Sequence, residues 1–154
     1  MTVDLASVPG GAGIIPVLTV PSASVAGPLA DALTAGGARC AFRTADAEQV
    51  IKAMAAHGGL TVGAGTVLSP EEAERAVAAG ARFVLSPGFD EEVVATCQAL
   101  NVPGIDAACW ADCLAEAAVV AVGGSWMATT AHVELENYAE IRQVTADAVE
   151  RSRA

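Results

Sequence analysis

Short apolar runs alternate along the chain with amphipathic segments, and glycine, proline or serine residues separate them. The clearest case lies at residues 60–88, where two β-favouring runs flank a segment whose apolar residues recur at helical spacing. Ser69 is expected to cap this helix with Glu72 as its partner in a capping box, and Gly80 is expected to end it. The stretch therefore predicts a strand, loop, helix, strand and loop in that order.

The same alternation predicts further elements on both sides of this stretch. Strands are expected at residues 14–20, 38–42, 60–62, 82–85 and 119–122, and further helices at residues 25–36, 46–58, 90–101 and 137–148. Asp90 is expected to cap the helix that it begins, and the helical spacing directs Leu33, Ile51 and Met54 to the core. The strand before Gly63 is expected to end in a loop that reaches Thr66, where small residues let the backbone approach a ligand. A strand that starts at Val102 is expected to stop short, because the chain passes at Ile105 into a helical segment around Trp110.

Repeated strand–helix units with short loops predict a parallel sheet, either doubly wound or closed as a (β/α) barrel. No Gly-x-Gly-x-x-Gly motif opens a helix near the amino end, which disfavours the dinucleotide-binding version of the doubly wound fold. A closed barrel uses eight strands and at least ~200 residues, whereas this sequence supplies about six strand candidates. The expected fold is therefore an α/β, TIM-type (β/α) barrel that is incomplete, in a single domain over residues 1–154.

Composition narrows the classes of protein to which the chain can belong. Because 53% of its residues are apolar and only 17% are charged, a compact globule with a real core is expected. The net charge of −10 would repel phosphate backbones, which argues against nucleic-acid binding through a basic face. No basic stretch precedes an apolar run near the amino end, and no run is long enough to span a membrane, so a cytoplasmic location is expected.

The cysteines and histidines do not form a metal-binding pattern. The four cysteines are Cys40, Cys97, Cys109 and Cys113, and the two histidines are His57 and His132. Cys109 and Cys113 would share one helical face, but two thiols without a nearby histidine make a poor zinc site and are more typical of small core side chains. Neither a metal nor a cofactor is therefore predicted.

Short motifs follow the expected strands in a fixed order. They are Ile15, Pro16 and Val17; Arg43 and Thr44; Gly63, Ala64, Gly65, Thr66, Val67 and Leu68; Ser86, Pro87 and Gly88; and Val122, Gly123, Gly124, Ser125 and Trp126. Each motif is weak alone, but the five in this order closely resemble the 2-keto-3-deoxy-6-phosphogluconate (KDPG) aldolases, which also act on 4-hydroxy-2-oxoglutarate (KHG). The resemblance covers nearly the whole chain in pieces.

This resemblance implies a (β/α) barrel, usually assembled as a homotrimer, that splits a sugar acid phosphate into pyruvate and glyceraldehyde 3-phosphate. In that family a lysine inside the barrel attacks the ketone, and the resulting iminium is the electron sink for carbon–carbon cleavage. A glutamate of the family shuttles protons as general acid and base. The implied partner is thus a small-molecule substrate, and no cofactor is needed.

Both catalytic residues of the family belong to motifs that this sequence lacks, so no catalytic residue is assigned. The second strand keeps only the end of the family pattern, Arg43 and Thr44, without its glutamate. The residues from Val102 join almost directly to Ile105, so the family strand that carries the lysine is missing. The only lysine is Lys52, which the helical pattern directs to solvent, whereas a Schiff-base lysine needs a desolvated site that lowers its pKa.

A set of binding residues remains, and each of them has an ordinary structural alternative. Arg43 matches the family arginine that grips the substrate carboxylate, or it is a solvated arginine after a strand. Thr66 and Pro87 match residues beside the pyruvyl group, or they are turn residues. Gly123, Gly124 and Ser125 match part of a phosphate grip made of main-chain N–H groups and a hydroxyl, or the glycines only turn the chain.

Three hypotheses for the function follow from this set of residues. The chain is a lyase with an unrecognised nucleophile, or it is a non-catalytic protein that binds phosphate or 2-oxo acids. Alternatively, it is a shortened relic whose unpaired strand edges favour association.

Overall fold

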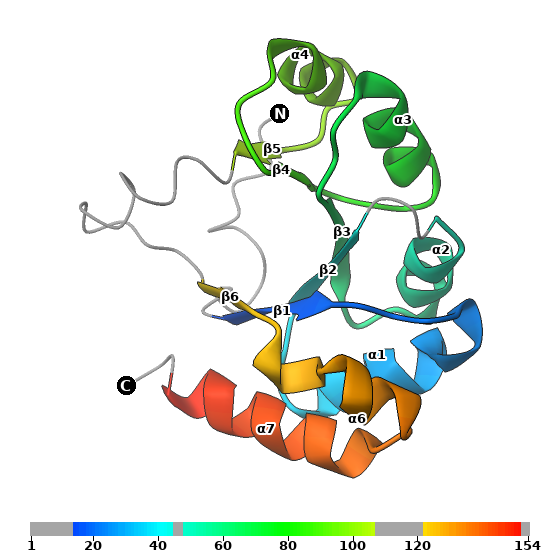
Figure 1. Cartoon of the computed structure of the whole chain (residues 1–154), viewed down its shortest axis with the longest axis vertical. Coiled ribbons are helices and arrows are strands. Elements are labelled where there is room, and N and C mark those ends of the chain that lie inside the picture. Colours follow the sequence, from blue (N-terminus) through cyan, green and yellow to red (C-terminus); the bar gives the residue numbers. More distant parts are fainter. Residues whose placement is uncertain (1–13, 45–47, 107–121, 152–154) are drawn as a thin grey trace.

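A computed structural model describes residues 14–44, 48–106 and 122–151 of the chain. In it, six parallel strands form one sheet in the order β5-β4-β3-β2-β1-β6 (Figure 1). The strands are β1 (Ile14–Leu18), β2 (Cys40–Thr44), β3 (Thr61–Gly65), β4 (Val84–Ser86), β5 (Gly104–Asp106) and β6 (Val122–Gly124). The α/β class and the parallel sheet are therefore as the sequence predicts.

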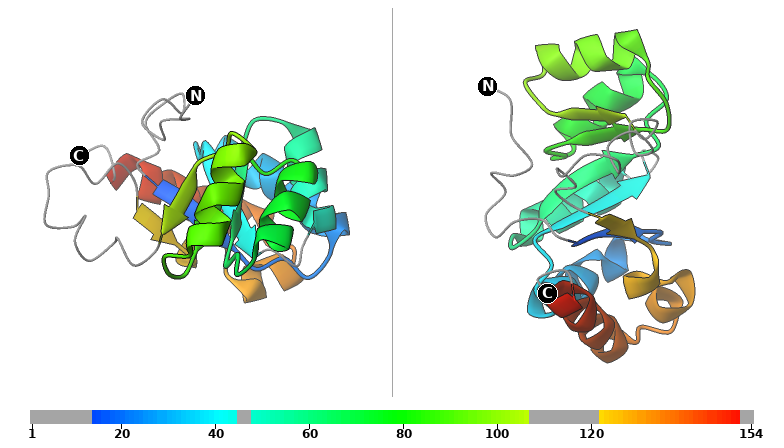
Figure 2. Two further views of the ribbon diagram at one scale, coloured as in Figure 1. Left: turned by 90° about the horizontal axis from the view of Figure 1, so that it is seen from above. Right: turned by 90° about the vertical axis from the view of Figure 1, so that its left-hand side faces the viewer.

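The helices lie on one side of the curved sheet, and the two views of Figure 2 agree with Figure 1 on this arrangement. They are α1 (Ala26–Ala35), α2 (Glu48–His57), α3 (Pro70–Ala78), α4 (Glu91–Ala99), α6 (Thr130–Glu134) and α7 (Tyr138–Arg151), with short 3₁₀ turns η2 (Ala23–Val25) and η4 (Trp126–Ala128). The predicted helix at residues 137–148 is confirmed as α7, whereas η4 and α6 are absent from the prediction. The segment around Trp110 lies outside the described residues.

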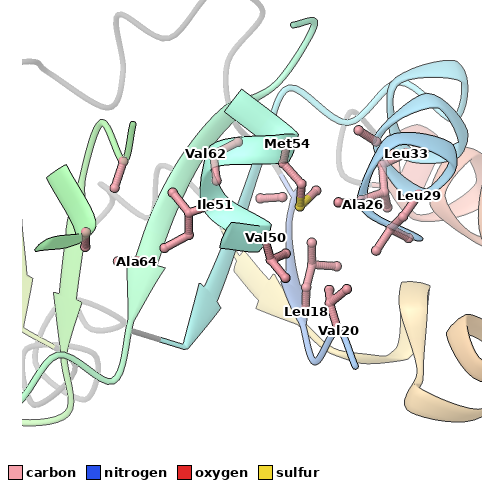
Figure 3. Packing of buried hydrophobic residues seen from close by; sticks show 14 of the residues in the cluster. Leu18, Val20, Ala26, Leu29, Leu33, Val50, Ile51, Met54, Val62 and Ala64 are labelled. Carbon is pink, nitrogen blue, oxygen red and sulfur yellow. The ribbon is translucent and has the colours of Figure 1, made fainter. Parts of the chain in front are cut away.

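The core fills the space between the sheet and the helices. Figure 3 shows Leu18 of β1 and Val62 of β3 near the side chains of α1 and α2. Ile51, Met54 and Leu33 are fully buried there, at the positions that the helical spacing predicts. Small residues such as Ala26, Ala30 and Ala64 complete this cluster, so helices and strands approach one another closely.

The two predicted helix caps at the start of α3 and α4 are present. The Glu72 main-chain N–H donates to the Ser69 hydroxyl at 3.3 Å, and the Glu72 carboxylate accepts from the Leu68 N–H at 2.8 Å. Asp90 caps α4 by accepting from the main-chain N–H groups of Glu92 and Val93, both at 3.0 Å. These bonds satisfy donors that the first turn of a helix leaves free.

The loop predicted from Gly63 is wrong, because β3 continues through Gly65. The reason is packing across the sheet: a Cβ on Gly63 would overlap the ring of Phe83, which is 1% exposed. Gly63 therefore allows a large buried ring to lie against the strand, where any side chain would collide with it. Only Thr66 of the predicted loop lies outside the strand.

Several strand boundaries also differ from the prediction. The second strand runs over Cys40–Thr44 rather than residues 38–42, because its pairing with β1 and β3 extends to Arg43. The strand from residue 82 begins only at Val84, and the last one is described over Val122–Gly124. The strand expected to stop short is completed as β5, because Ile105 and Asp106 pair with β4. Pairing with neighbouring strands, rather than local propensity, thus sets these strand boundaries.

Candidate binding site at the carboxyl edge of the sheet

The carboxyl ends of all six strands lie along the same edge of the sheet, since all of them are parallel. Ligands of parallel α/β proteins bind at this edge. The structure places every binding residue predicted from the sequence there. Arg43 lies near the end of β2, Thr66 follows β3, Pro87 follows β4, and Gly124 and Ser125 lie at the end of β6.

Arg43 lies within β2, not after it as the sequence predicts. Its main chain is in register with Leu18 of β1 on one side and Ala64 of β3 on the other. Ala64 is in turn in register with Val84 of β4. The backbone of Arg43 is therefore held at the centre of the sheet, and both interpretations of its guanidinium group stay predictions.

Thr66 follows β3 in a strained backbone conformation. Its φ is +59°, in the left-handed region that a β-branched residue rarely adopts. The next two residues are fixed, because the Val67 N–H donates to the Leu85 carbonyl oxygen at 3.0 Å and the Leu68 N–H donates to Glu72. Thr66 itself is exposed, so the surrounding structure holds an exposed hydroxyl in an unfavourable backbone geometry.

The end of β4 turns at Pro87, which is exposed. The residue before it, Ser86, is only 6% exposed, and its hydroxyl donates to the Gly88 carbonyl oxygen at 2.7 Å. Pro87 is a site residue predicted from the sequence, whereas Ser86 is named there only as part of the strand-end motif. The signal was available, because a serine immediately before Pro-Gly can hydrogen-bond to the main chain of the turn that follows.

The glycine pair of the predicted phosphate grip lies in β6, not in a loop after it. Gly123 and Gly124 pair with Ile15 and Pro16 of β1. A Cβ on Gly124 would overlap the ring of Trp126, so this glycine makes room for the indole. Ser125 is the first residue beyond the strand, it is exposed, and its hydroxyl makes no capping hydrogen bond to η4.

The strand ends differ in the charge of the helices that follow them. Two glutamates lie in the first turn of α3 and two in that of α4, whereas the first turns of η4 and α6 contain no acidic residue. A hydrogen bond from its own main-chain N–H and another from the Ser69 hydroxyl hold the pKa of the Glu71 carboxyl below its ordinary value of 4.5. The ends of β3 and β4 therefore carry negative charge, and the end of β6 is the more favourable place for an anion.

Lys52 and Cys97 do not add a reactive group to this edge. Lys52 is exposed on α2, in the helical layer, as the sequence predicts. Cys97 is buried, and burial raises the pKa of its thiol, so the group is protonated and unreactive at neutral pH. Within residues 14–44, 48–106 and 122–151, no three metal-ligating side chains gather, and no helix is both long and apolar enough to cross a membrane. The pair Cys109 and Cys113 lies outside these ranges.

Curated relatives match the chain over different lengths. The 2-dehydro-3-deoxy-phosphogluconate aldolase of Treponema pallidum is 48% identical over 94 residues, which are 58% of this chain and 45% of that protein. The chain thus spans less than half of this relative's length. The KHG/KDPG aldolase of Escherichia coli K12 is 28% identical over 196 aligned positions, covering 91% of this chain and 92% of that protein. That alignment is longer than the chain of 154 residues, so it includes positions that this chain lacks.

Solved structures of aldolases share the fold. A KDPG aldolase of Legionella pneumophila, with pyruvate captured as a covalent carbinolamine, superposes with a TM-score of 0.80 at 22% identity, covering 94% of this chain and 98% of that one. A 2-keto-3-deoxy-6-phospho-gluconate aldolase of Zymomonas mobilis gives the same TM-score and identity, covering 94% and 96%. The family model "KDPG and KHG aldolase" matches residues 7–109, which is more than half of the chain. The chain therefore belongs to the KDPG and KHG aldolase family.

Proposed function

We propose that this chain binds a 2-oxo acid, or the phosphate ester of a 2-oxo sugar acid, at the carboxyl edge of its sheet without forming a Schiff base. The observation that carries the proposal is the position of Lys52, the only lysine in the sequence, which is exposed on α2. A Schiff-base lysine needs a desolvated site, and an exposed position on a helix does not provide one. The binding residues, by contrast, all lie at one edge.

In this proposal the ligand carboxylate is held at the end of β2 by Arg43, whose guanidinium group can form two parallel hydrogen bonds to it. Thr66 and Pro87 on the next two strand ends line the place of the oxo group. A phosphate group lies at the end of β6, where the Ser125 hydroxyl makes no capping hydrogen bond and no acid occupies the first turn of η4. Family membership supports these roles.

Aldol cleavage is the second candidate function. The family model and the aldolase named in the Treponema pallidum relative favour it. Class I cleavage needs an amine that forms an iminium, and Lys52 is the one lysine side chain that this sequence offers. The glutamate that shuttles protons in the family is also missing from the second strand. Cleavage would therefore require both roles to be taken by other residues.

An incomplete barrel is part of the proposal. In the described part of the chain, β5 and β6 are the outer strands of the sheet, and the alignment with the Escherichia coli relative includes positions that this chain lacks. We further propose a homotrimer, as the family resemblance implies. Size-exclusion chromatography with light scattering tests the assembly: a single trimeric peak supports it, and a broad distribution of large species favours the relic with unpaired strand edges.

Binding is tested by calorimetry with pyruvate and with 2-keto-3-deoxy-6-phosphogluconate. Arg43→Ala is expected to weaken binding about ten-fold or more, because hydrogen bonds to a charged group contribute about 1.5–3 kcal/mol. Arg39→Ala is the matched control, since Arg39 is an exposed arginine just before β2, at the opposite edge of the sheet. Equal affinity of the two variants, or no binding by the unaltered chain, would refute the proposal.

A further inference from the structure

Ser86 is a buried polar residue next to the exposed Pro87 at the proposed site. It is the last residue of β4 and is 6% exposed, whereas Pro87 and Phe89 beyond it are exposed. Its main chain is in register with Asp106 of β5, so the residue is anchored within the sheet. A buried hydroxyl in this place needs a hydrogen-bond partner, because an unpaired one would lose its hydration without compensation.

The partner is the main chain on the far side of Pro87. The Ser86 hydroxyl donates to the Gly88 carbonyl oxygen at 2.7 Å and thereby closes a short ring around the proline. Proline has no N–H group with which to hold the turn itself. A Cβ on Gly88 would meet nothing within 4 Å, so packing on that side of the turn does not hold it either. The hydroxyl therefore fixes the turn.

The turn lies beside the end of β3. The Ala64 N–H donates to the Phe83 carbonyl oxygen at 3.0 Å, and the Val67 N–H donates to the Leu85 carbonyl oxygen at the same distance. These two bonds join β3 to β4 on either side of Thr66. Any movement of the turn after Ser86 would thus change the position of Pro87 relative to Thr66.

We propose that Ser86 is a positioning residue, whose hydrogen bond to Gly88 keeps Pro87 aligned with Thr66 to receive the oxo end of a bound 2-oxo acid. This inference rests on the proposed function for the identity of the ligand. It goes beyond it by assigning a role to a side chain that the ligand does not touch.

The test compares Ser86→Cys, which replaces the hydroxyl by a slightly larger and only weakly donating thiol, with Ser86→Thr, which keeps the hydroxyl. Gly88→Ala is the control, because the added methyl group has space. Chymotrypsin cleavage after the exposed Phe89, followed by mass spectrometry, reports opening of the turn. We expect cleavage about five-fold faster in Ser86→Cys, the equivalent of one lost hydrogen bond, and unchanged rates in Ser86→Thr and Gly88→Ala. Urea unfolding of each variant shows whether global stability has changed.

Calorimetry with pyruvate supplies the second measurement. The expected result is affinity about five-fold weaker in Ser86→Cys and restored in Ser86→Thr, a pattern that a loss of global stability alone would not produce. Wild-type rates and wild-type affinity in Ser86→Cys would overturn the inference, as would faster cleavage with unchanged affinity. If the unaltered chain does not bind pyruvate, the proposed function fails, and the cleavage rates alone decide whether Ser86 holds the turn.

Discussion

Strands β3 and β6 use the same packing device in different surroundings. In both strands a glycine lies under an aromatic ring: Gly63, in the middle of β3, lies under Phe83, which is 1% exposed, and Gly124, at the end of β6, lies under Trp126, which is 48% exposed. Beyond the ends of β3 and β4, loops are hydrogen-bonded and helices begin with acids, whereas Ser125 after β6 makes no capping bond and the first turn of η4 contains no acid. One part of the edge is rigid and negative, and the other is open to an anion.

Under the proposed function, this difference would allow ligand binding to remain without Schiff-base chemistry. The β3 and β4 ends owe their shape to packing and main-chain bonds that also stabilise the fold, such as the bond from Val67 to Leu85. They persist whether or not a ligand binds. Ser125, by contrast, is exposed beyond the end of β6 and makes no capping bond, so the proposed phosphate contact at this position is independent of the core.

Replacing the two glycines by alanine should lower the free energy of unfolding by different amounts. Gly63→Ala should lower the free energy of unfolding by about 3 kcal/mol, because Phe83 is enclosed and has no space into which to move. Gly124→Ala should lower it by about 1 kcal/mol, because the half-exposed Trp126 ring can swing toward solvent. Urea denaturation of both variants measures this. Equal losses would contradict the contrast between the two strands.

A charge change should make the end of β6 resemble the ends of β3 and β4. Ser125→Asp is expected to weaken binding of inorganic phosphate about ten-fold, since like charges in contact repel even in water. Gln98→Glu adds the same charge to an exposed position of α4 and serves as the control. Calorimetry at constant ionic strength is the measurement. Equal weakening in both variants would mean that net charge alone, rather than this strand end, governs binding.

The backbone strain at Thr66 and its proposed contact with the ligand should have separate effects, the first on stability and the second on pyruvate binding. Thr66→Gly removes a β-branched side chain from φ +59° and should raise the free energy of unfolding by about 0.5 kcal/mol while weakening pyruvate binding. Glu136→Gly relieves the same kind of strain at φ +51°, between α6 and α7, and should stabilise the fold without changing binding. Pyruvate affinity that is unaffected by Thr66→Gly would remove Thr66 from the site.

A smaller effect is expected on how stability changes as the pH falls. The folded-state pKa of Glu71 lies below its ordinary value of 4.5, so its ionised form stabilises the fold above that value, and the contribution is lost as the pH falls through the folded pKa. Melting temperatures measured from pH 7 to pH 3 should fall less steeply for Glu71→Gln than for the unaltered chain. Parallel curves would show that the Glu71 hydrogen bonds do not affect stability.

Local signals predicted the elements well where the cause is local. The caps Ser69 and Asp90 and the buried stripe through Ile51 and Met54 depend on neighbours within a few residues, and all of them are confirmed. The continuation of β3 through Gly63 could not be predicted in this way, because it depends on a ring that reaches the strand from across the sheet.

The same distinction between local and tertiary causes applies to the candidate site. Its location at the strand ends follows from the alternation of strands and helices, so the sequence placed Thr66 and Pro87 on adjoining ends. The pairing of Gly123 and Gly124 with β1 was missed, because a glycine pair has a local preference for turns and only the neighbouring strand overrides it. The buried hydrogen bond of Ser86 was missed because burial comes from tertiary packing.

Binding without a Schiff base is tested by the intact mass of the protein after incubation with pyruvate and borohydride. Borohydride reduces an iminium to a stable adduct, so a reactive amine is recorded as added mass. We predict an unmodified mass under conditions in which calorimetry shows pyruvate bound, for the unaltered chain and for Lys52→Ala alike. A stoichiometric pyruvyl adduct that is lost in Lys52→Ala would contradict the claim and establish Lys52 as the nucleophile of a working aldolase.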